Sequence, residues 1–227
     1  MKTTLPRTFQ LTLSMAAASL MLASCGGGGG DDAPAPAATE GRVKAQAVFT
    51  PTTPIPADAN VRGMWGEVTA WPLIPLHTVL MPDGRVMSYG TDGNGTQTAH
   101  TIYDVWDPEQ GLTAGHLTLP NNTLTDIFCS SQLVLPSGGA VFVAGGDNWN
   151  GTGTTNTGNN NSNTFTLATN TLARGNNMNR PRWYSSSITL LNGETYIQGG
   201  SGGTDFPEVR QADGTFRLLS KIGRAHV

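Results

Sequence analysis

Two side chains of this sequence combine chemical reactivity with matching positions in the chain: the thiol of Cys129 and the phenol of Tyr184. Each stands at the start of a short apolar stretch that is followed by a tight turn and a second apolar stretch. The second cysteine of the chain, Cys25, lies near the N-terminus. Cys129 therefore has two interpretations, a small buried hydrophobic residue or a free thiol with a chemical role.

The two apolar stretches belong to a repeat. Residues 75–90, 126–146 and 182–200 each read as a strand, a tight turn and a second strand that ends on glycine. Alignment of Gly84, Gly139 and Gly193 gives steps of 55 and 54 residues. A period near 50 residues with paired glycines is typical of the kelch repeat of β-propellers. The glycines let the innermost strands of a propeller approach one another closely.

Further strands are expected after each hairpin, which gives each repeat material for a four-stranded blade. Closed propellers have roughly four to eight blades. The sequence therefore predicts an all-β fold with about three blades of a larger, seven-bladed kelch-type ring. The additional strands are expected at residues 101–106, 163–168 and 208–216, with 63–71 as an outer strand and 148–163 as a long polar loop.

Innermost strands of adjacent blades line the propeller axis side by side. Cys129 and Tyr184 occupy near-equivalent places in two successive repeats. We therefore expect the thiol and the phenol to approach contact distance across a blade boundary.

The segments that carry these two residues resemble a known family. Asp-Ile-Phe-Cys129, followed by Ala-Gly-Gly-Asp147, is similar to the cysteine segment of galactose oxidase and glyoxal oxidase, the copper radical oxidases. Arg-Pro-Arg-Trp-Tyr184-Ser-Ser, followed by Gly-Gly, is similar to the tyrosine segment of that family. The resemblance covers residues 63–220 and is more specific than the kelch glycines alone.

The resemblance implies a copper ion on the propeller axis, with Tyr184 as a ligand whose ring is joined to Cys129 by a thioether bond. Such a cross-linked tyrosine forms the radical that these enzymes use. Phe128 and Trp183 flank the pair and would shield the radical, with plain packing as the alternative for each. The family oxidises a primary alcohol, a carbohydrate or an aldehyde with O2 and releases H2O2.

Two features depart from the family pattern. Gly202 stands where fungal galactose oxidase has an aromatic residue over the thioether, which favours a glyoxal oxidase-like activity. The three histidines His77, His100 and His116 do not match the family's copper motifs, and we expect them on the surface or on strand faces. With one family ligand for copper, this stretch is expected to be inactive by itself. The alternative function is a non-catalytic kelch lipoprotein that binds carbohydrate or protein.

Composition limits the other classes of function. Lys and Arg number 13 against 16 Asp and Glu, and no block of basic residues occurs. A protein that neutralises many phosphates needs such a block, so no nucleic acid partner is expected. Charged residues make up only 13% of the chain, and 29 glycines and 14 prolines argue against a helical bundle.

The N-terminal segment predicts export. Residues 1–24 combine two early basic residues with an apolar run too short to span a membrane, which is typical of a signal peptide. Small residues before Cys25 resemble the bacterial lipobox, in which the cysteine is lipidated, and an ordinary cleaved signal is the alternative. Gly26 after it implies an outer-membrane lipoprotein of a Gram-negative bacterium, held to the membrane by the lipid only. Residues 25–60 predict a flexible tether rich in Gly, Pro and Ala.

The last six residues are predicted not to belong to the natural protein sequence. Residues 222–227, Ile-Gly-Arg-Ala-His-Val, match the translation of a common sequencing adapter, and a genuine C-terminus is the alternative. We therefore expect the partial propeller to occupy residues 61–221 and the natural sequence to continue past Lys221. His226 is not taken as a ligand.

Overall fold

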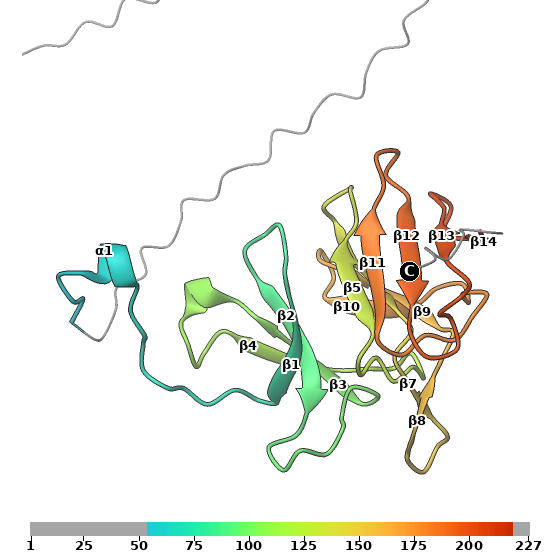
Figure 1. The fold of residues 1–227 in the computed structure, drawn as a ribbon. Coiled ribbons are helices and arrows are strands. Elements are labelled where there is room, and N and C mark those ends of the chain that lie inside the picture. Colours follow the sequence, from blue (N-terminus) through green and yellow to red (C-terminus); the bar gives the residue numbers. More distant parts are fainter. Residues whose placement is uncertain (1–53, 220–227) are drawn as a thin grey trace, which may run out of the picture. The chain divides into compact units, whose positions relative to one another are not determined.

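Three four-stranded antiparallel sheets make up most of the computed structural model, which describes residues 54–219 (Figure 1). Sheet order follows chain order within each blade, with one insertion in the second. Blade 1 contains β1 (Ile74–Leu80), β2 (Val86–Thr91), β3 (Ile102–Trp106) and β4 (His116–Pro120). Blade 2 contains β5 (Ser131–Val134), β6 (Ala140–Ala144), β9 (Ser162–Thr166) and β10 (Thr171–Arg174). Blade 3 contains β11 (Ser185–Thr189), β12 (Thr195–Gly199), β13 (Glu208–Arg210) and β14 (Phe216–Leu218).

The three predicted hairpins are confirmed as β1–β2, β5–β6 and β11–β12. Gly84 and Gly193 adopt positive φ angles and donate to the carbonyl oxygens of Met81 and Leu190, which closes each turn. In blade 2 the equivalent residue is Gly138, not the predicted Gly139, because Gly138 has φ +69° and donates to the carbonyl of Leu135. The aligned turns are therefore 54 and 55 residues apart.

The blades are held together by two apolar layers. One cluster joins blades 1 and 2 and includes Tyr89, Val105, Val141, Val143 and Phe165. The other joins blades 2 and 3 and includes Phe142, Ala144, Met178 and Ile197. Alternate side chains of β6 enter opposite layers, and this central strand is buried on both faces. Blade 2 therefore buries both of its faces against its neighbours, as the repeat predicted.

Three predicted elements differ from the structure. Residues 63–71 form no strand and are largely exposed; the fourth strand of blade 1 is β4, which the sequence analysis missed. Residues 208–216 are not one strand, because a turn in which Gly214 donates to Gln211 separates β13 from β14. The predicted polar loop 148–163 contains a hairpin of β7 (Asp147–Trp149) and β8 (Thr154–Gly158).

Side-chain hydrogen bonds explain the inserted hairpin. Asn150 Oδ1 accepts from the backbone N–H groups of Thr152 and Gly153, and Asp147 Oδ1 accepts from that of Thr157. Asn and Thr side chains on a solvent-facing ribbon carry no hydrophobic alternation. The apolar pattern of the sequence therefore did not predict this pair of strands.

Two short helices complete the described part: α1 (Ala59–Arg62), which begins within the predicted tether and buries no residue, and the 3-10 helix η1 (Pro108–Gln110). No helix in residues 54–219 is long and apolar enough to cross a membrane. The predicted signal peptide, the lipidation residue Cys25, most of the tether and the tail 222–227 lie outside the described residues.

Candidate active site

The structure brings Cys129 and Tyr184 together at the boundary between blades 2 and 3. The backbone N–H of Tyr184 donates to the carbonyl oxygen of Cys129 over 2.9 Å. Cys129 lies in the turn that leads into β5, and Tyr184 immediately precedes β11. These two innermost strands lie side by side (Figure 1). The predicted approach across a blade boundary is therefore present in the backbone.

Both residues adopt the left-handed backbone conformation, with φ +58° at Cys129 and φ +65° at Tyr184. This region is unfavourable for residues with bulky side chains, and such strain is concentrated at functional sites. The two turns therefore place both residues in the same uncommon conformation at corresponding points of neighbouring blades.

The two side chains lie close enough to shift each other's pKa. The neighbouring Cys129 thiol raises the pKa of the Tyr184 phenol, and burial adds to this shift. Burial raises the pKa of the Cys129 thiol, while the neighbouring Tyr184 and Trp183 side chains oppose that shift. The thiol is shielded, with 7% of the residue exposed, whereas Tyr184 is 62% exposed. Both groups keep their protons near neutral pH, and the phenol remains open to a ligand.

Glycines allow the close approach of the loops. A Cβ atom on Gly146 would overlap the carbonyl oxygen of Asp126, in the segment that leads to Cys129. A Cβ atom on Gly200 would lie 2.9 Å from the carbonyl oxygen of Trp183. The paired glycines of the repeat therefore make room for the two segments that carry the reactive side chains.

A buried ion pair fixes the tyrosine segment. Arg182 and Glu208 are both fully buried, and Arg182 Nε and Nη2 donate to Glu208 Oε1 over 3.0 and 2.7 Å. Arg182 also donates to the carbonyl oxygens of Gly199, Gly203 and Phe206. Arg182 belongs to the motif that resembles the family, but the sequence predicted no role for it. Its place directly before Trp183 and Tyr184 was the signal that could have indicated one.

The two flanking aromatic residues have different surroundings. The ring of Trp183 lies against that of Tyr184, with centroids 4.5 Å apart and planes tilted by 35°. Phe128 packs against the apolar layer between blades 1 and 2 and meets His77 edge to face. Of the two, Trp183 has the ring in contact with the phenol.

The predicted surface or strand-face placement holds for two of the three histidines. His77 and His116 lie on β1 and β4, and His116 Nδ1 is 2.7 Å from Oδ2 of the buried Asp104. His100 lies neither on the surface nor on a strand face. It lies in the turn before β3, and its ring stacks on Trp149, with 3.8 Å between centroids. One contact of His77 was not predicted. His77 Nε2 accepts a hydrogen bond from the Cys129 N–H over 3.0 Å.

The resemblance to copper radical oxidases implies one copper ligand in the described residues, Tyr184. A phenolate oxygen with imidazole nitrogens suits Cu(II), and the exposed Tyr184 can supply that oxygen. Within residues 54–219, no group of three or more His, Cys, Asp or Glu side chains is arranged to hold a metal ion. The donor set of this part therefore fits a contribution to a copper site and not a complete site.

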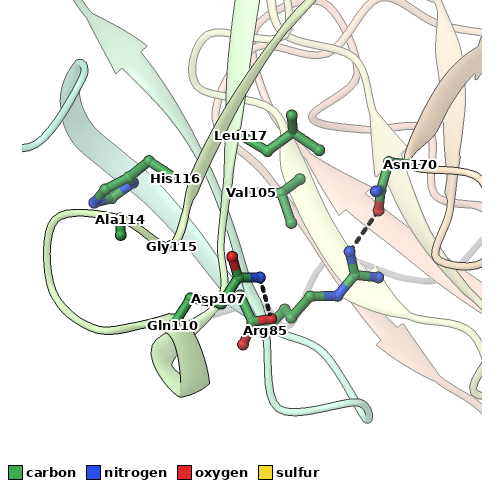
Figure 2. A pocket seen from close by; sticks show the side chains of 9 residues that line it. All are labelled: Arg85, Val105, Asp107, Gln110, Ala114, Gly115, His116, Leu117 and Asn170. Atoms are coloured by element: carbon green, nitrogen blue, oxygen red, sulfur yellow. Dashed lines mark hydrogen bonds between the residues drawn. The ribbon is translucent and has the colours of Figure 1, made fainter.

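A separate cavity of about 240 Å³ has His116 in its lining but neither Cys129 nor Tyr184 (Figure 2). Its polar side chains already have partners. Arg85 pairs with Asp83 and donates to Asn170, while Asp107 accepts from Gln110 and caps η1. The lining residues are Arg85, Val105, Asp107, Gln110, Ala114, Gly115, His116, Leu117 and Asn170.

The described fold is a partial kelch-like β-propeller in which a cysteine and a tyrosine of adjacent blades are linked by a backbone hydrogen bond. No family model matches the chain. Two galactose oxidases of Gibberella zeae are each 26% identical over 144 residues, which cover 61% of this chain and 19% of theirs. A solved fungal alcohol oxidase of the AA5 family, in complex with copper, matches with a TM-score of 0.55 and 21% identity. That match covers 68% of this chain and 32% of the oxidase.

These comparisons confirm two predictions. The chain is galactose oxidase-like, and its fold matches that of a copper-binding oxidase. The chain spans only 19% of the length of the curated relatives it matches. The similarity to this part of the relatives therefore does not by itself show the activity of the whole protein.

Proposed function

We propose that this chain is part of a copper radical oxidase that oxidises a primary alcohol or an aldehyde with O2. One observation carries the proposal: Cys129 and Tyr184 meet across a blade boundary, where the Tyr184 N–H donates to the Cys129 carbonyl oxygen over 2.9 Å. The sequence similarity to galactose oxidases and the fold of a copper-binding oxidase support the choice of enzyme class.

The first chemical step would join the two side chains. A carbon–sulfur bond forms between Sγ of Cys129 and a ring carbon next to the hydroxyl of Tyr184. The thiol loses one hydrogen and the ring loses one, and the two protons and two electrons pass to O2 to give H2O2. The hydrogen bond from the Tyr184 N–H to the Cys129 carbonyl oxygen holds the two residues together at the blade boundary where this bond would form.

In turnover, a primary alcohol would lose two electrons and two protons to give an aldehyde, and O2 would accept them to give H2O2. An aldehyde would react through its hydrate and give a carboxylic acid with the same balance. Bound copper would supply a one-electron redox centre beside the cross-linked tyrosine. This chain contributes Tyr184 as an oxygen ligand, and Trp183 covers one side of its ring.

Gly202 favours a glyoxal oxidase-like over a galactose oxidase-like substrate range. Gly202 has φ +87°, and a Cβ atom there would lie 2.7 Å from Cγ of Pro181, so an aromatic side chain does not fit without displacement of the loop. The aromatic neighbour of Tyr184 is instead the preceding residue, Trp183. In the same proposal, lipidation at Cys25 tethers the enzyme to the bacterial outer membrane.

Mass spectrometry of the full-length protein tests the proposal. The protein is incubated with Cu(II) and O2, digested, and searched for a peptide that joins Cys129 to Tyr184 with loss of two hydrogens. Variants C129S and Y184F serve as controls and should lack the joined peptide. Peroxide release is then measured with simple alcohols and aldehydes. Absence of both the peptide and the peroxide would refute the oxidase and favour a propeller that binds carbohydrate or protein.

A further inference from the structure

A histidine of blade 1 contacts the cysteine loop of blade 2. Nε2 of His77, on β1, accepts a hydrogen bond from the backbone N–H of Cys129 over 3.0 Å. Cys129 is buried and has a positive φ angle, so its N–H lies in a shielded turn. A buried N–H without an acceptor is unfavourable, and this bond favours the observed turn over alternatives.

The ring of His77 is itself held in place from two sides. It stacks on Tyr89, with centroids 5.0 Å apart and planes 22° apart, and meets Phe128 edge to face. The hydroxyl of Tyr89 lies 2.7 Å from Ser130 Oγ and donates to Gln132 Oε1. The histidine and the tyrosine of blade 1 therefore contact the residues on both sides of Cys129.

The direction of the hydrogen bond fixes the state of the imidazole. Because the Cys129 N–H is the donor, Nε2 carries a lone pair and the ring proton is on Nδ1 of a neutral ring. Burial lowers the pKa of His77, which favours this neutral form. His77 thus acts as a hydrogen-bond acceptor on a fixed aromatic support.

We propose that His77 is a positioning residue that holds the Cys129 turn in the conformation needed for the thioether bond to Tyr184. This inference rests on the proposed function. The hydrogen bond to His77 restrains the N–H of Cys129, and the hydrogen bond from the Tyr184 N–H restrains its carbonyl oxygen. Loss of the acceptor leaves the turn free to populate conformations in which sulfur points away from the ring.

Two substitutions distinguish the contribution of the hydrogen-bond acceptor of His77 from that of its aromatic ring. H77F keeps an aromatic ring over Tyr89 but has no acceptor, whereas H77Q has an oxygen near the position of Nε2 but no ring. T78A is the matched control, because Thr78 is the exposed neighbour on the opposite face of β1. Each full-length protein is mixed with Cu(II) and O2, and the mass loss of two hydrogens at Cys129–Tyr184 is followed over time, together with the melting temperature.

We expect H77F to form the cross-link roughly fivefold to tenfold more slowly, as loss of one hydrogen bond implies, while H77Q and T78A stay near the wild-type rate. Equal rates in H77F and wild type would overturn the inference and leave the proposed oxidase intact. Equal slowing in H77F and H77Q, in step with their melting temperatures, would also overturn it by showing a packing effect. A wild-type protein that never forms the cross-link would refute the proposed function itself.

Discussion

Arg182 and Glu208 form an ion pair in which neither side chain is exposed to solvent. Glu208 also accepts from the backbone and side-chain nitrogens of Asn179. Arg182 in turn donates to the carbonyl oxygens of Gly199, at the end of β12, and of Gly203 and Phe206, in the loop that leads to β13. The pair therefore joins the segment before Tyr184 to the start of β13, and it holds Trp183 and Tyr184 against blade 2.

Removal of one partner should be strongly destabilising. R182M leaves the carboxylate of Glu208 buried without its counter-charge, and we expect the free energy of unfolding to fall by about 3–5 kcal/mol. Urea titration of the full-length protein measures this change. The control R217M alters an exposed arginine on β14 and should stay within about 0.5 kcal/mol of wild type. A similar, small effect of both substitutions would show that the buried pair does not hold the loop.

Gly146 should tolerate no side chain. Its φ is +128°, and a Cβ atom would overlap the carbonyl oxygen of Asp126. We expect G146A to lose at least about 2 kcal/mol of stability, since both backbone strain and the displaced neighbour contribute. The variant should also form less of the Cys129–Tyr184 cross-link, because Asp126 begins the cysteine turn.

Gly139 provides the matched control for this experiment. A Cβ atom there has no neighbouring atom within 4 Å, and its φ angle is not positive. G139A should therefore keep the wild-type stability and the wild-type yield of cross-link, both measured beside G146A. Should G146A match G139A in both respects, the close approach of Gly146 to the cysteine turn would have no energetic consequence.

The hairpins and the meeting of Cys129 with Tyr184 could be predicted because each depends on a local pattern that repeats. Turn glycines and apolar strands recur in every blade, and repetition fixes which residues are equivalent. The roles of Arg182 and His77 could not be predicted in this way. Their partners, Glu208 and the Cys129 backbone, are 26 and 52 residues away and carry no sequence periodicity. Such contacts exist only once neighbouring loops have been placed by the fold.

The inserted β7–β8 hairpin should depend on one aromatic contact. Trp149 stacks on His100 of blade 1, with planes 14° apart. W149A removes this stack, and we expect faster cleavage at residues 150–153 in limited proteolysis, with a loss of global stability of about 1 kcal/mol. N148A changes an exposed neighbour on the same strand and should leave the cleavage rate unchanged. Equal protection of W149A and wild type would show that backbone pairing alone secures the hairpin.

Asp126 should make the stability of the protein depend on pH. Its side chain is fully buried, and Oδ1 accepts from the N–H of Phe128. Oδ2 has no hydrogen-bond partner in residues 54–219 and lies 3.8 Å from Nδ1 of His100. Burial raises the pKa of Asp126 to about 6, and the negative charge of Asp147 adds to the shift. The buried thiol of Cys129 lies close enough to be affected by both carboxylates.

The sign of the effect follows from this raised pKa. Between pH 4 and 6 the unfolded chain releases the proton of Asp126 while the folded protein retains it, so stability falls as pH rises through this window. D126N keeps an oxygen for the Phe128 N–H and carries no charge. We expect it to be more stable than wild type at pH 8, by up to about 3 kcal/mol, and equally stable near pH 4. Urea titrations of both proteins from pH 4 to 8 measure the difference, and a pH-independent difference would show that Asp126 does not retain its proton in the folded protein.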